Sequence, residues 1–352
     1  MKRFLAFVFI TAIAAACGGT ATTSPSPSVS ASAPASPTAT AKKIRVGLVT
    51  DVGGLDDKGF NTLANKGRMD AQSQLGIDSN VIESKEQANY VPNLTNFAQQ
   101  GYDLVIGVGF LMTNATWKVA KAFPSVKFAI VDGAPADDSG KTENLPNVAN
   151  LFFKEQESGY VVGVVTGEML KGKIGKATTG KACAMGGLPI PPVDRFIAGY
   201  QDALAKYNVT PAIAYSQSFT DQQKGKEIGL QQISQGCSVL FQVAGQSGLG
   251  YIQAAKDKNV YAIGVDADQA FVAPETVLTS AVKKVDRAVF LTIQSVKDGK
   301  FKAGDNSFDA TNDSTGFGTV NKDVPSAVKA AADSALADIK SGKIKPSDTI
   351  KK

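Results

Sequence analysis

The stretch IRVGLVTDVGGLDDKGFNTLA, residues 44–64, joins an apolar run to a segment rich in acids and glycines. Residues 44–50 have the length and composition of a buried strand. The fourteen residues that follow contain three acids, three glycines and one aromatic. Residues 61–76 then have the spacing of an amphipathic helix. The stretch therefore predicts a strand–loop–helix unit whose loop lies at the carboxyl end of the strand.

The same pattern recurs along the chain. Buried strands are expected at 103–109 and 127–132, and helical segments at 61–76 and 90–101. A second set of strands is expected in the segments GKACAMGG (180–187), AIAYSQSF (212–219), SVLFQVAG (238–245) and VYAIGVD (260–266), with helices at 193–208 and 221–236. Alternation of strands and helices predicts a parallel sheet covered on both faces. Because the unit occurs twice, we predict an α/β fold of two doubly wound, Rossmann-like lobes with a central cleft.

The composition argues against catalysis. The chain of 352 residues is 43% apolar and 20% charged, which is typical of globular proteins, and its formal charge of +5 is spread out, so we expect no nucleic-acid partner. It contains no histidine, the usual general base and commonest metal ligand. Two Gly-x4-Gly-Lys segments, at 167–173 and 175–181, lack the Ser or Thr of a phosphate-binding loop. We therefore predict a protein that is not an enzyme and has no metal or cofactor.

The N-terminal segment MKRFLAFVFITAIAAAC, residues 1–17, predicts export. It has a basic start and an apolar stretch at 4–16 that is too short to span a bilayer. Its end, AAACGG, looks like a bacterial lipobox, in which Cys17 is lipidated. A plain signal peptide cut near Ala16 is the alternative.

Residues 18–43 are rich in Ser, Pro, Ala and Thr and nearly free of large apolar residues. Such a segment cannot bury enough surface to fold, so it is expected to be a disordered tether. A lipid on Cys17 and this tether together predict a domain anchored to the cell membrane and facing the extracytoplasmic side.

Polar and aromatic residues follow the predicted strands of both lobes. In open parallel sheets, ligands bind beyond the carboxyl ends of the strands. In the first lobe these positions hold Asp51, Gly109, Phe110 and Asp132, and in the second Gly186, Gly187, Gly245 and Asp266. We therefore expect one ligand held from both sides.

Several ordered motifs resemble one known family. They are RVGLVTDVGGLDDKGFNTLANKG, VIGVGFLMTNA, FAIVDG, FKEQESGYVVGVVTGEM, DRFIAGYQDAL, YAIGVDADQ and LTSAVKKVD. Together, from residue 45 to residue 286 and more weakly beyond, they resemble the basic membrane protein family of bacterial lipoproteins. These are nucleoside-binding relatives of the ribose-type (type I) periplasmic binding proteins. The resemblance implies an ABC transporter substrate-binding lipoprotein that takes a purine nucleoside (adenosine, guanosine or inosine) and delivers it to a separate permease for import.

The resemblance also implies roles for aromatic and amide side chains. Phe60 is expected to stack on the base, with Phe196 as the opposing face and Asn61 as a partner for the base edge. Phe110 is expected to line the same site. A flat base stacked on an aromatic ring contributes about 1–3 kcal/mol.

Charged residues are expected to identify the ligand. By resemblance, Asp132 recognises the base, Asp266 accepts from a ribose hydroxyl and Lys283 donates to the ribose, with Lys284 as the neighbouring alternative. Asp51 and Gly245 are expected as further contacts. The predicted lobes are 44–153 plus 277–305, and 154–276 plus 306–352.

Each of these residues has a structural alternative. Phe60 and Phe196 could be core aromatics, Asp51, Asp132 and Asp266 helix caps, and Lys283 a solvated surface residue. The alternative functions are a receptor of the same fold for another polar solute, such as a sugar or autoinducer, and a surface lipoprotein without a role in transport.

Two cysteines remain besides Cys17. Cys183 lies in the first predicted strand of the second lobe and Cys237 at the head of its third, and such strands are often neighbours in a doubly wound sheet. Outside the membrane a disulfide is one expectation, and two buried free thiols are the other.

Overall fold

The structure is a computed structural model that describes residues 43–351. The predicted export signal, the lipidation of Cys17 and the tether up to residue 42 lie outside the described residues, so they stay predictions. From residue 43 onward the chain forms one compact unit.

The first lobe is built on a six-stranded, fully parallel sheet in the order β11-β5-β4-β3-β1-β2. Its strands are β1 (Arg45–Val49), β2 (Asp78–Ile82), β3 (Leu104–Val108), β4 (Lys127–Val131), β5 (Val148–Phe153) and β11 (Gly304–Phe308). Its helices are α1 (Phe60–Leu75), α2 (Tyr90–Gln99), α3 (Thr113–Ala122) and α8 (Val285–Lys297).

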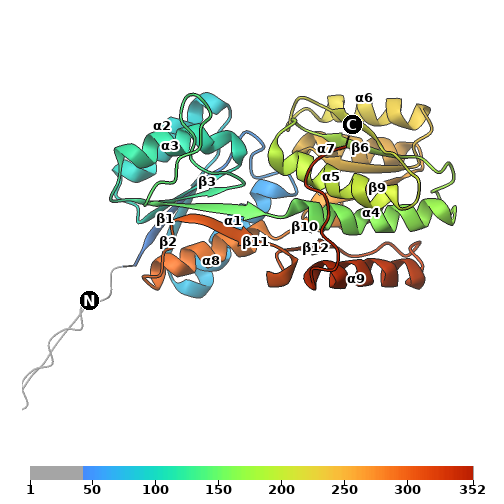
Figure 1. The fold of residues 1–352 in the computed structure, drawn as a ribbon. Coiled ribbons are helices and arrows are strands. Elements are labelled where there is room, and N and C mark those ends of the chain that lie inside the picture. Colours follow the sequence, from blue (N-terminus) through green and yellow to red (C-terminus); the bar gives the residue numbers. More distant parts are fainter. Residues whose placement is uncertain (1–42, 352) are drawn as a thin grey trace, which may run out of the picture. The chain divides into compact units, whose positions relative to one another are not determined.

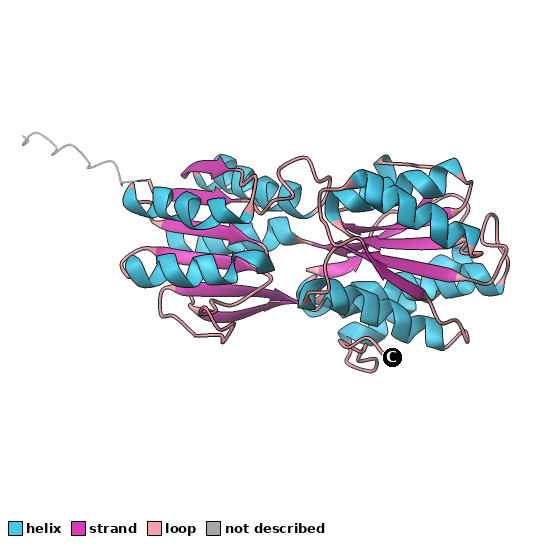
Figure 2. Cartoon of the chain, turned by 90° about the horizontal axis from the view of Figure 1, so that it is seen from above, coloured by secondary structure: helices cyan, strands magenta, loops and turns pink. Residues whose placement is uncertain are grey.

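Both faces of this sheet are covered, as Figure 2 shows. Leu104, Ile106 and Val108 of β3 pack with α1 and α8 on one face, whereas Val105 packs with α2 and α3 on the other. This alternation is the period of two expected of a strand buried on both sides. The strand ends therefore remain as the place for polar side chains.

The second lobe repeats the plan in the order β12-β10-β9-β8-β6-β7. Only β12 runs antiparallel, against β10. The strands are β6 (Ala182–Gly186), β7 (Ala212–Tyr215), β8 (Val239–Val243), β9 (Tyr261–Asp266), β10 (Val277–Lys283) and β12 (Thr315–Phe317). The helices are α4 (Glu155–Lys171), α5 (Pro191–Ala205), α6 (Gln222–Ser234), α7 (Gly245–Asp257) and α9 (Ser326–Lys340).

Two separate cores flank the second sheet. Helices α4, α5 and α9 pack on one face, and α6 and α7 on the other. Short 3-10 helices complete the fold: η1 (Gln87–Asn89), η2 (Phe110–Met112), η3 (Gln269–Phe271) and η4 (Ala310–Asn312). Two doubly wound lobes were predicted, and this prediction is confirmed.

The boundaries between the lobes differ from the expected ones. Residues 277–283 were assigned to the first lobe, but they form β10, which pairs with β9 and β12 in the second sheet. Residues 306–308 were assigned to the second lobe, but they belong to β11, which pairs with β5 in the first. A short strand has the same sequence pattern in either sheet, so only the pairing decides where it belongs.

Three segments connect the lobes, after β5, after β10 and after β11, and Figure 1 shows them together on the lower side of the view. They are bonded to one another. The backbone N–H of Lys154 donates to the carbonyl of Phe308 (3.1 Å), and its ammonium lies 2.7 Å from Asp309 Oδ2. The backbone N–H of Lys284, after β10, donates to the carbonyl of Ser314, after β11 (2.8 Å). The hinge between the lobes therefore consists of three connecting segments that are bonded to one another.

Within residues 43–351, none of the helices combines the length and apolar character needed to cross a bilayer.

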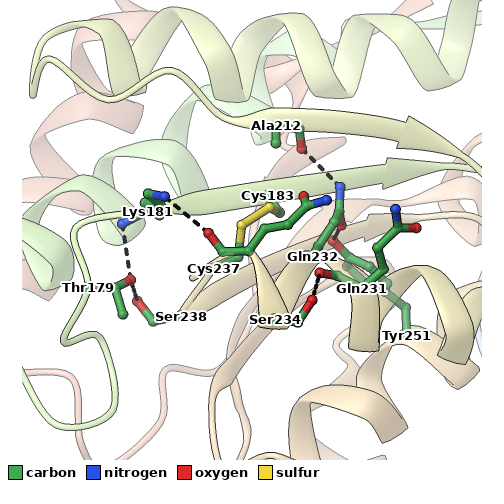
Figure 3. Close-up of a disulfide and its surroundings, with 11 residues drawn as sticks. Thr179, Lys181, Cys183, Ala212, Gln231, Gln232, Ser234, Cys237, Ser238 and Tyr251 are labelled. Atoms are coloured by element: carbon green, nitrogen blue, oxygen red, sulfur yellow. Dashed lines mark hydrogen bonds between the residues drawn. A yellow bond between two sulfur atoms is a disulfide. The ribbon is translucent and has the colours of Figure 1, made fainter.

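A disulfide links Cys183 of β6 to Cys237, two residues before β8 (Figure 3). The two strands are neighbours in the sheet, and the Cα atoms are 5.9 Å apart, within the usual range for a disulfide. Both cysteines are buried in the core beneath α6 and α7. Of the two expectations for these thiols, the structure has the disulfide.

Reduction of this disulfide should weaken the protein. The bond joins residues 54 apart in sequence, and a loop of that length corresponds to about 4 kcal/mol in the chain-entropy description. We expect Cys183→Ala/Cys237→Ala and the reduced protein to lose a similar amount in guanidinium unfolding. Titration of the denatured, unreduced protein should find no free thiol at either position. Two titratable thiols and a stability indifferent to reductant would contradict the assignment.

Candidate functional site

The carboxyl ends of both sheets meet at a cavity that is partly open to solvent. Loops from both lobes line it, because each sheet turns its strand ends toward the other lobe. The lining residues are Asp51, Gly53, Asp57, Phe60, Asn61, Gly109, Phe110, Leu111, Asp132, Ile190, Pro192, Val193, Phe196, Phe219, Val243, Ala244, Gly245, Asp266 and Lys283.

The structure brings all nine predicted ligand contacts to this one cavity. They are Asp51, Phe60, Asn61, Phe110, Asp132, Phe196, Gly245, Asp266 and Lys283. Lys284, the alternative to Lys283, is the N-cap of α8 and is not part of the lining. That these residues bind a ligand stays a prediction.

Asp57 organises the loop that carries the first residues of the site. Its Oδ1 accepts from the backbone N–H groups of Gly59 (2.9 Å) and Thr62 (3.1 Å), and its Oδ2 from the backbone N–H of Asn61 (2.7 Å). These bonds satisfy free donors at the start of α1. The carboxylate thus fixes the direction in which Phe60 leaves the loop. Asp57 was not predicted as a site residue, although its place just before a helical segment is a capping signal.

Asn61 is engaged differently from the expectation. Its side-chain amide donates to Asp51 Oδ1 (2.8 Å) and to Asp57 Oδ2 (3.1 Å), and its oxygen accepts from the backbone N–H of Asp51 (3.3 Å). Both amide hydrogens are therefore bound to protein carboxylates. In this structure Asn61 orients Asp51, and donating to a base edge would require one of the two amide bonds to break, whereas the amide oxygen keeps a second lone pair.

Lys283 lies at the centre of the charged groups and is only 2% exposed. Its ammonium is 2.7 Å from Asp132 Oδ2, 3.4 Å from Glu155 Oε1 and 3.9 Å from Asp266 Oδ1. Burial alone would lower its pKa, but attraction to these three carboxylates outweighs burial and raises it. Lys283 is a permanent cation and not the solvated surface residue of the alternative interpretation.

Aromatic rings surround this cation. The ammonium of Lys283 lies 4.9 Å from the ring centre of Phe60, 5.2 Å from that of Phe153 and 5.5 Å from that of Phe196. Phe60 belongs to the first lobe and Phe196 to the second, and both line the cavity, although Phe196 is 2% exposed and also packs in the core of its own lobe. The ring faces also stabilise the buried charge.

Glu155 and Arg195 stand behind the cavity wall and were not foreseen. Glu155, the first residue of α4, is fully buried, and its Oε2 accepts from Arg195 Nε at 2.6 Å while Oε1 faces Lys283. Arg195 precedes Phe196 on α5. The pair therefore ties the hinge segment after β5 to the helix that supplies the second ring. A charged residue at a helix start is an ordinary surface pattern, so the sequence carried no signal for it.

Asp132 and Asp266 occupy matching places, directly after β4 in the first lobe and as the last residue of β9 in the second. Both have positive φ angles, 67° and 61°, which are uncommon for residues other than glycine. In each, Oδ1 is buried and has no hydrogen-bond partner among the described residues. Each lobe therefore has one buried acceptor without a partner in the described part of the chain, on a residue that lines the cavity.

Burial dominates the acidity of the cavity carboxyls. It raises the pKa of Asp51 to about 6 and that of Asp266 to about 7. The pKa of Asp132 is also raised, to about 6, because burial outweighs the attraction of Lys283. Raised pKa values of carboxyl groups that are buried in a cleft are typical of functional sites.

Phe219 adds an aromatic that the sequence analysis missed. A strand was predicted over residues 212–219, whereas β7 ends at Tyr215, and Phe219 turns toward the cavity from the loop that follows. A Cβ atom on Gly187 would collide with the ring of Phe219, and one on Gly186 with that of Tyr215. These two glycines, expected as strand-end contacts, lie outside the lining and make room for the rings.

Among residues 43–351, no group of three or more His, Cys, Asp or Glu side chains is arranged to hold a metal ion.

Comparison with known proteins places this geometry in one family. Residues 44–350 match the model of the Bmp family, described as ABC transporter substrate-binding protein PnrA-like. The chain is 30% identical over 325 residues to the ABC transporter nucleoside-binding protein BmpA of Lactococcus lactis, covering 86% of this chain and 88% of that protein.

Two further matches extend the comparison. An uncharacterized lipoprotein of Pyrococcus abyssi is 35% identical over 75% of this chain, and the matched part is 66% of that protein, so the chain spans about two thirds of its length. A solved ABC transporter solute-binding protein of Aeropyrum pernix superposes with a TM-score of 0.77 at 29% identity, covering 86% of this chain and 92% of that one.

The raised pKa values predict how stability depends on pH. The folded carboxyl of Asp266 keeps its proton up to about pH 7, whereas the unfolded chain releases it near pH 3.8. Between these values the folded state binds more protons, so the free energy of unfolding falls as the pH rises. Asp266→Asn removes this titrating group, so the free energy of unfolding of the variant should fall less steeply with pH. We expect the slope to differ from that of the parent by up to about 1.4 kcal/mol per pH unit between pH 5 and pH 7, measured by urea unfolding.

The control is Asp56→Asn, which changes a side chain that is 93% exposed in the same loop before α1. It should retain the pH dependence of the parent chain. An Asp266→Asn variant whose stability falls with pH as steeply as the parent's would show that Asp266 is ionised throughout.

Proposed function

This chain belongs to the Bmp family of PnrA-like ABC transporter substrate-binding proteins, and we propose that it binds a purine nucleoside between its two lobes for import. The observation that carries the proposal is the pairing of aromatic rings and unoccupied carboxylate oxygens from both lobes around one cavity. The relative from Lactococcus lactis named as nucleoside-binding supports the same ligand class.

The shape and lining of the cavity suit a flat heterocycle. Its lining is mainly apolar and aromatic with a few convergent polar groups, as is typical of small-molecule sites. Phe60 and Phe110 come from the first lobe and Phe196 and Phe219 from the second. We propose that a base enters between these two sets of rings and stacks on Phe60, whose side chain is the less buried of the predicted pair.

The polar groups suit a ligand that donates hydrogen bonds. The free oxygens of Asp132 and Asp266 need donors, which the N–H groups of a purine and the hydroxyls of a ribose supply. A charge-assisted hydrogen bond contributes about 1.5–3 kcal/mol. We propose that Asp132 reads the base and that Asp266 and Lys283 hold the ribose.

The sign of the site charge favours a neutral ligand. Five carboxyl groups face two cations, Lys283 and Arg195, and the excess is negative once the pH exceeds the raised pKa values of three of these carboxyls; the five are Asp51, Asp57, Asp132, Glu155 and Asp266. A phosphate would add negative charge to this excess. The site therefore favours a nucleoside over a nucleotide.

The proposed cycle couples binding to closure. Each lobe supplies part of the contact set, so a ligand bonds fully only when the lobes are together and shifts the population to the closed form. We propose that the closed form delivers the nucleoside to the permease of an ABC transporter. In the same proposal, the lipid on Cys17 holds the protein at the extracytoplasmic face of the membrane.

Calorimetric titration with adenosine, guanosine, inosine, uridine and ribose tests the ligand class. We expect binding of at least one purine nucleoside and a loss of roughly ten- to hundredfold in affinity on Phe60→Ala, because a stacked base is worth about 1–3 kcal/mol. Phe271→Ala, on an exposed ring outside the cavity, is the matched control and should bind as the parent does. Competition by ribose alone, or no heat with any nucleoside, would speak for a different solute.

A second titration tests the charge argument. For whichever purine nucleoside binds, we expect its 5′-monophosphate to bind at least about tenfold more weakly, because the phosphate enters a site with excess carboxylates. Equal affinity for the two ligands would show that the phosphate avoids this charge, and would remove the electrostatic argument for a nucleoside.

A further inference from the structure

We propose that Gln246 and Gln269 form a closure latch, a pair of side-chain amides of the second lobe that grip the 51–59 loop of the first lobe without touching the ligand. The latch sets how firmly the lobes close. Its effect on affinity rests on the proposed function, because it presumes that the cavity encloses a ligand.

Both bonds run from the second lobe to backbone carbonyls of the same loop. The amide of Gln246 donates to the carbonyl of Gly53 at 2.8 Å, and that of Gln269 donates to the carbonyl of Lys58 at 3.1 Å. Neither glutamine lines the cavity. The gripped loop, however, carries Asp51 and Asp57 and leads into Phe60, so the latch fixes the loop on which the first-lobe contacts depend.

Gln269 is held in the donating orientation by its own lobe. It is 1% exposed, and its Oε1 accepts from Gln242 Nε2 (2.7 Å) and from the backbone N–H of Val265 (3.1 Å). Its backbone N–H donates to Ser280 Oγ (2.9 Å). With the oxygen occupied, the NH₂ group must face the first lobe. All these partners lie in the second lobe, so the donor stays aimed when the lobes part.

Gln246 is connected to the cavity wall. It lies in the first turn of α7, next to Gly245, and its backbone N–H donates to the carbonyl of Phe219 at 2.9 Å. Gly245 and Phe219 both line the cavity. Movement of this end of the latch is therefore transmitted to the second-lobe contacts.

The 51–59 loop, whose carbonyls accept these bonds, is also held in a fixed conformation. Lys58 has a φ of 55°, which turns its carbonyl toward the second lobe, and a Cβ on Gly59 would lie 3.7 Å from Gln269 Nε2 and 3.8 Å from Asp266. On its other side the loop is held by the Asp57 carboxylate. Both partners are thus preorganised, and closing the latch requires little ordering of either.

The latch acts through the balance of open and closed forms. Its two bonds join protein groups only, so they favour closure with or without a ligand and hold a share of the ligand-free molecules closed. The apparent affinity of any ligand is proportional to that closed share. Loss of the latch should therefore weaken all ligands by one common factor and leave their ranking unchanged.

The test uses the double variant Gln246→Ala/Gln269→Glu, with Gln246→Ala alone as a second, milder variant. Glutamate keeps the acceptor oxygen that Gln242 and Val265 need and replaces the donating NH₂ by a second oxygen, which repels the carbonyl of Lys58. The control is Gln253→Ala on the same helix, whose side chain bonds only Asp257 of that helix. Thermal unfolding should show that all three variants fold.

Two readouts separate the latch from the identity of the ligand. Small-angle scattering of the ligand-free double variant should give a larger radius of gyration than the parent and the control. Every nucleoside that binds the parent should bind the double variant about tenfold more weakly, with faster dissociation. An unchanged ligand-free radius of gyration overturns the latch, and so does a loss confined to one nucleoside. If no nucleoside binds the parent, the proposed function fails, and scattering alone still decides on the latch.

Discussion

The arrangement of the two lobes depends on one buried cation. Lys283 is the last residue of a second-lobe strand, yet its ammonium bonds Asp132 of the first lobe and faces Glu155 beside the hinge. A buried charge whose partner is removed costs roughly 3–5 kcal/mol, so separation of the lobes must be accompanied by water entering around Lys283. Closure of the cleft therefore adds Asp132 to the carboxylates around Lys283, whose other partners, Glu155 and Asp266, belong to its own lobe.

Around this cation the two lobes supply different chemistry from equivalent positions. Asp132 and Asp266 end matching strands with the same unusual backbone conformation. The first lobe accepts through the carbonyls of Gly53 and Lys58 and the carboxylate of Asp132. The second lobe donates to them through Gln246, Gln269 and Lys283. One lobe therefore mainly accepts and the other mainly donates across the interface, which makes the two surfaces complementary although the folds repeat.

Much of this arrangement could be predicted from the sequence, for identifiable reasons. Strands such as 104–108 and 239–243 are continuous apolar runs buried on both faces. The rule that ligands bind beyond the carboxyl ends of strands, together with the family resemblance, then selected nine residues that share one cavity. Two edge strands of the first sheet escaped prediction, and so did the interior strands β5 and β10. The strand at 78–82, DSNVI, and that at 304–308, GDNSF, are polar and partly exposed, so they lack the apolar signal that marks the central strands.

The functional residues that were not predicted from the sequence share a different property. Glu155, Phe219, Gln246 and Gln269 matter because of partners far away in sequence, and no local pattern encodes such a partner. Asn61 shows the converse case. It was placed in the right cavity, but its neighbours Asp51 and Asp57 take up its amide, and only the geometry reveals that competition.

The chain passes between the lobes three times, and this also constrains the order in which the lobes can fold. The core beneath α1 requires α8, whose Asp286 pairs with Lys66 across 220 residues at 3.1 Å, and the sheet edge requires β11. Most of the second lobe lies between these parts, and β12 and α9 follow them. During synthesis the amino-terminal lobe therefore cannot finish folding until residues past 300 have emerged, and the nascent chain spends most of its elongation with apolar strand surfaces uncovered. A late-folding chain of this kind stays compatible with passage through a narrow channel and with capture by chaperones.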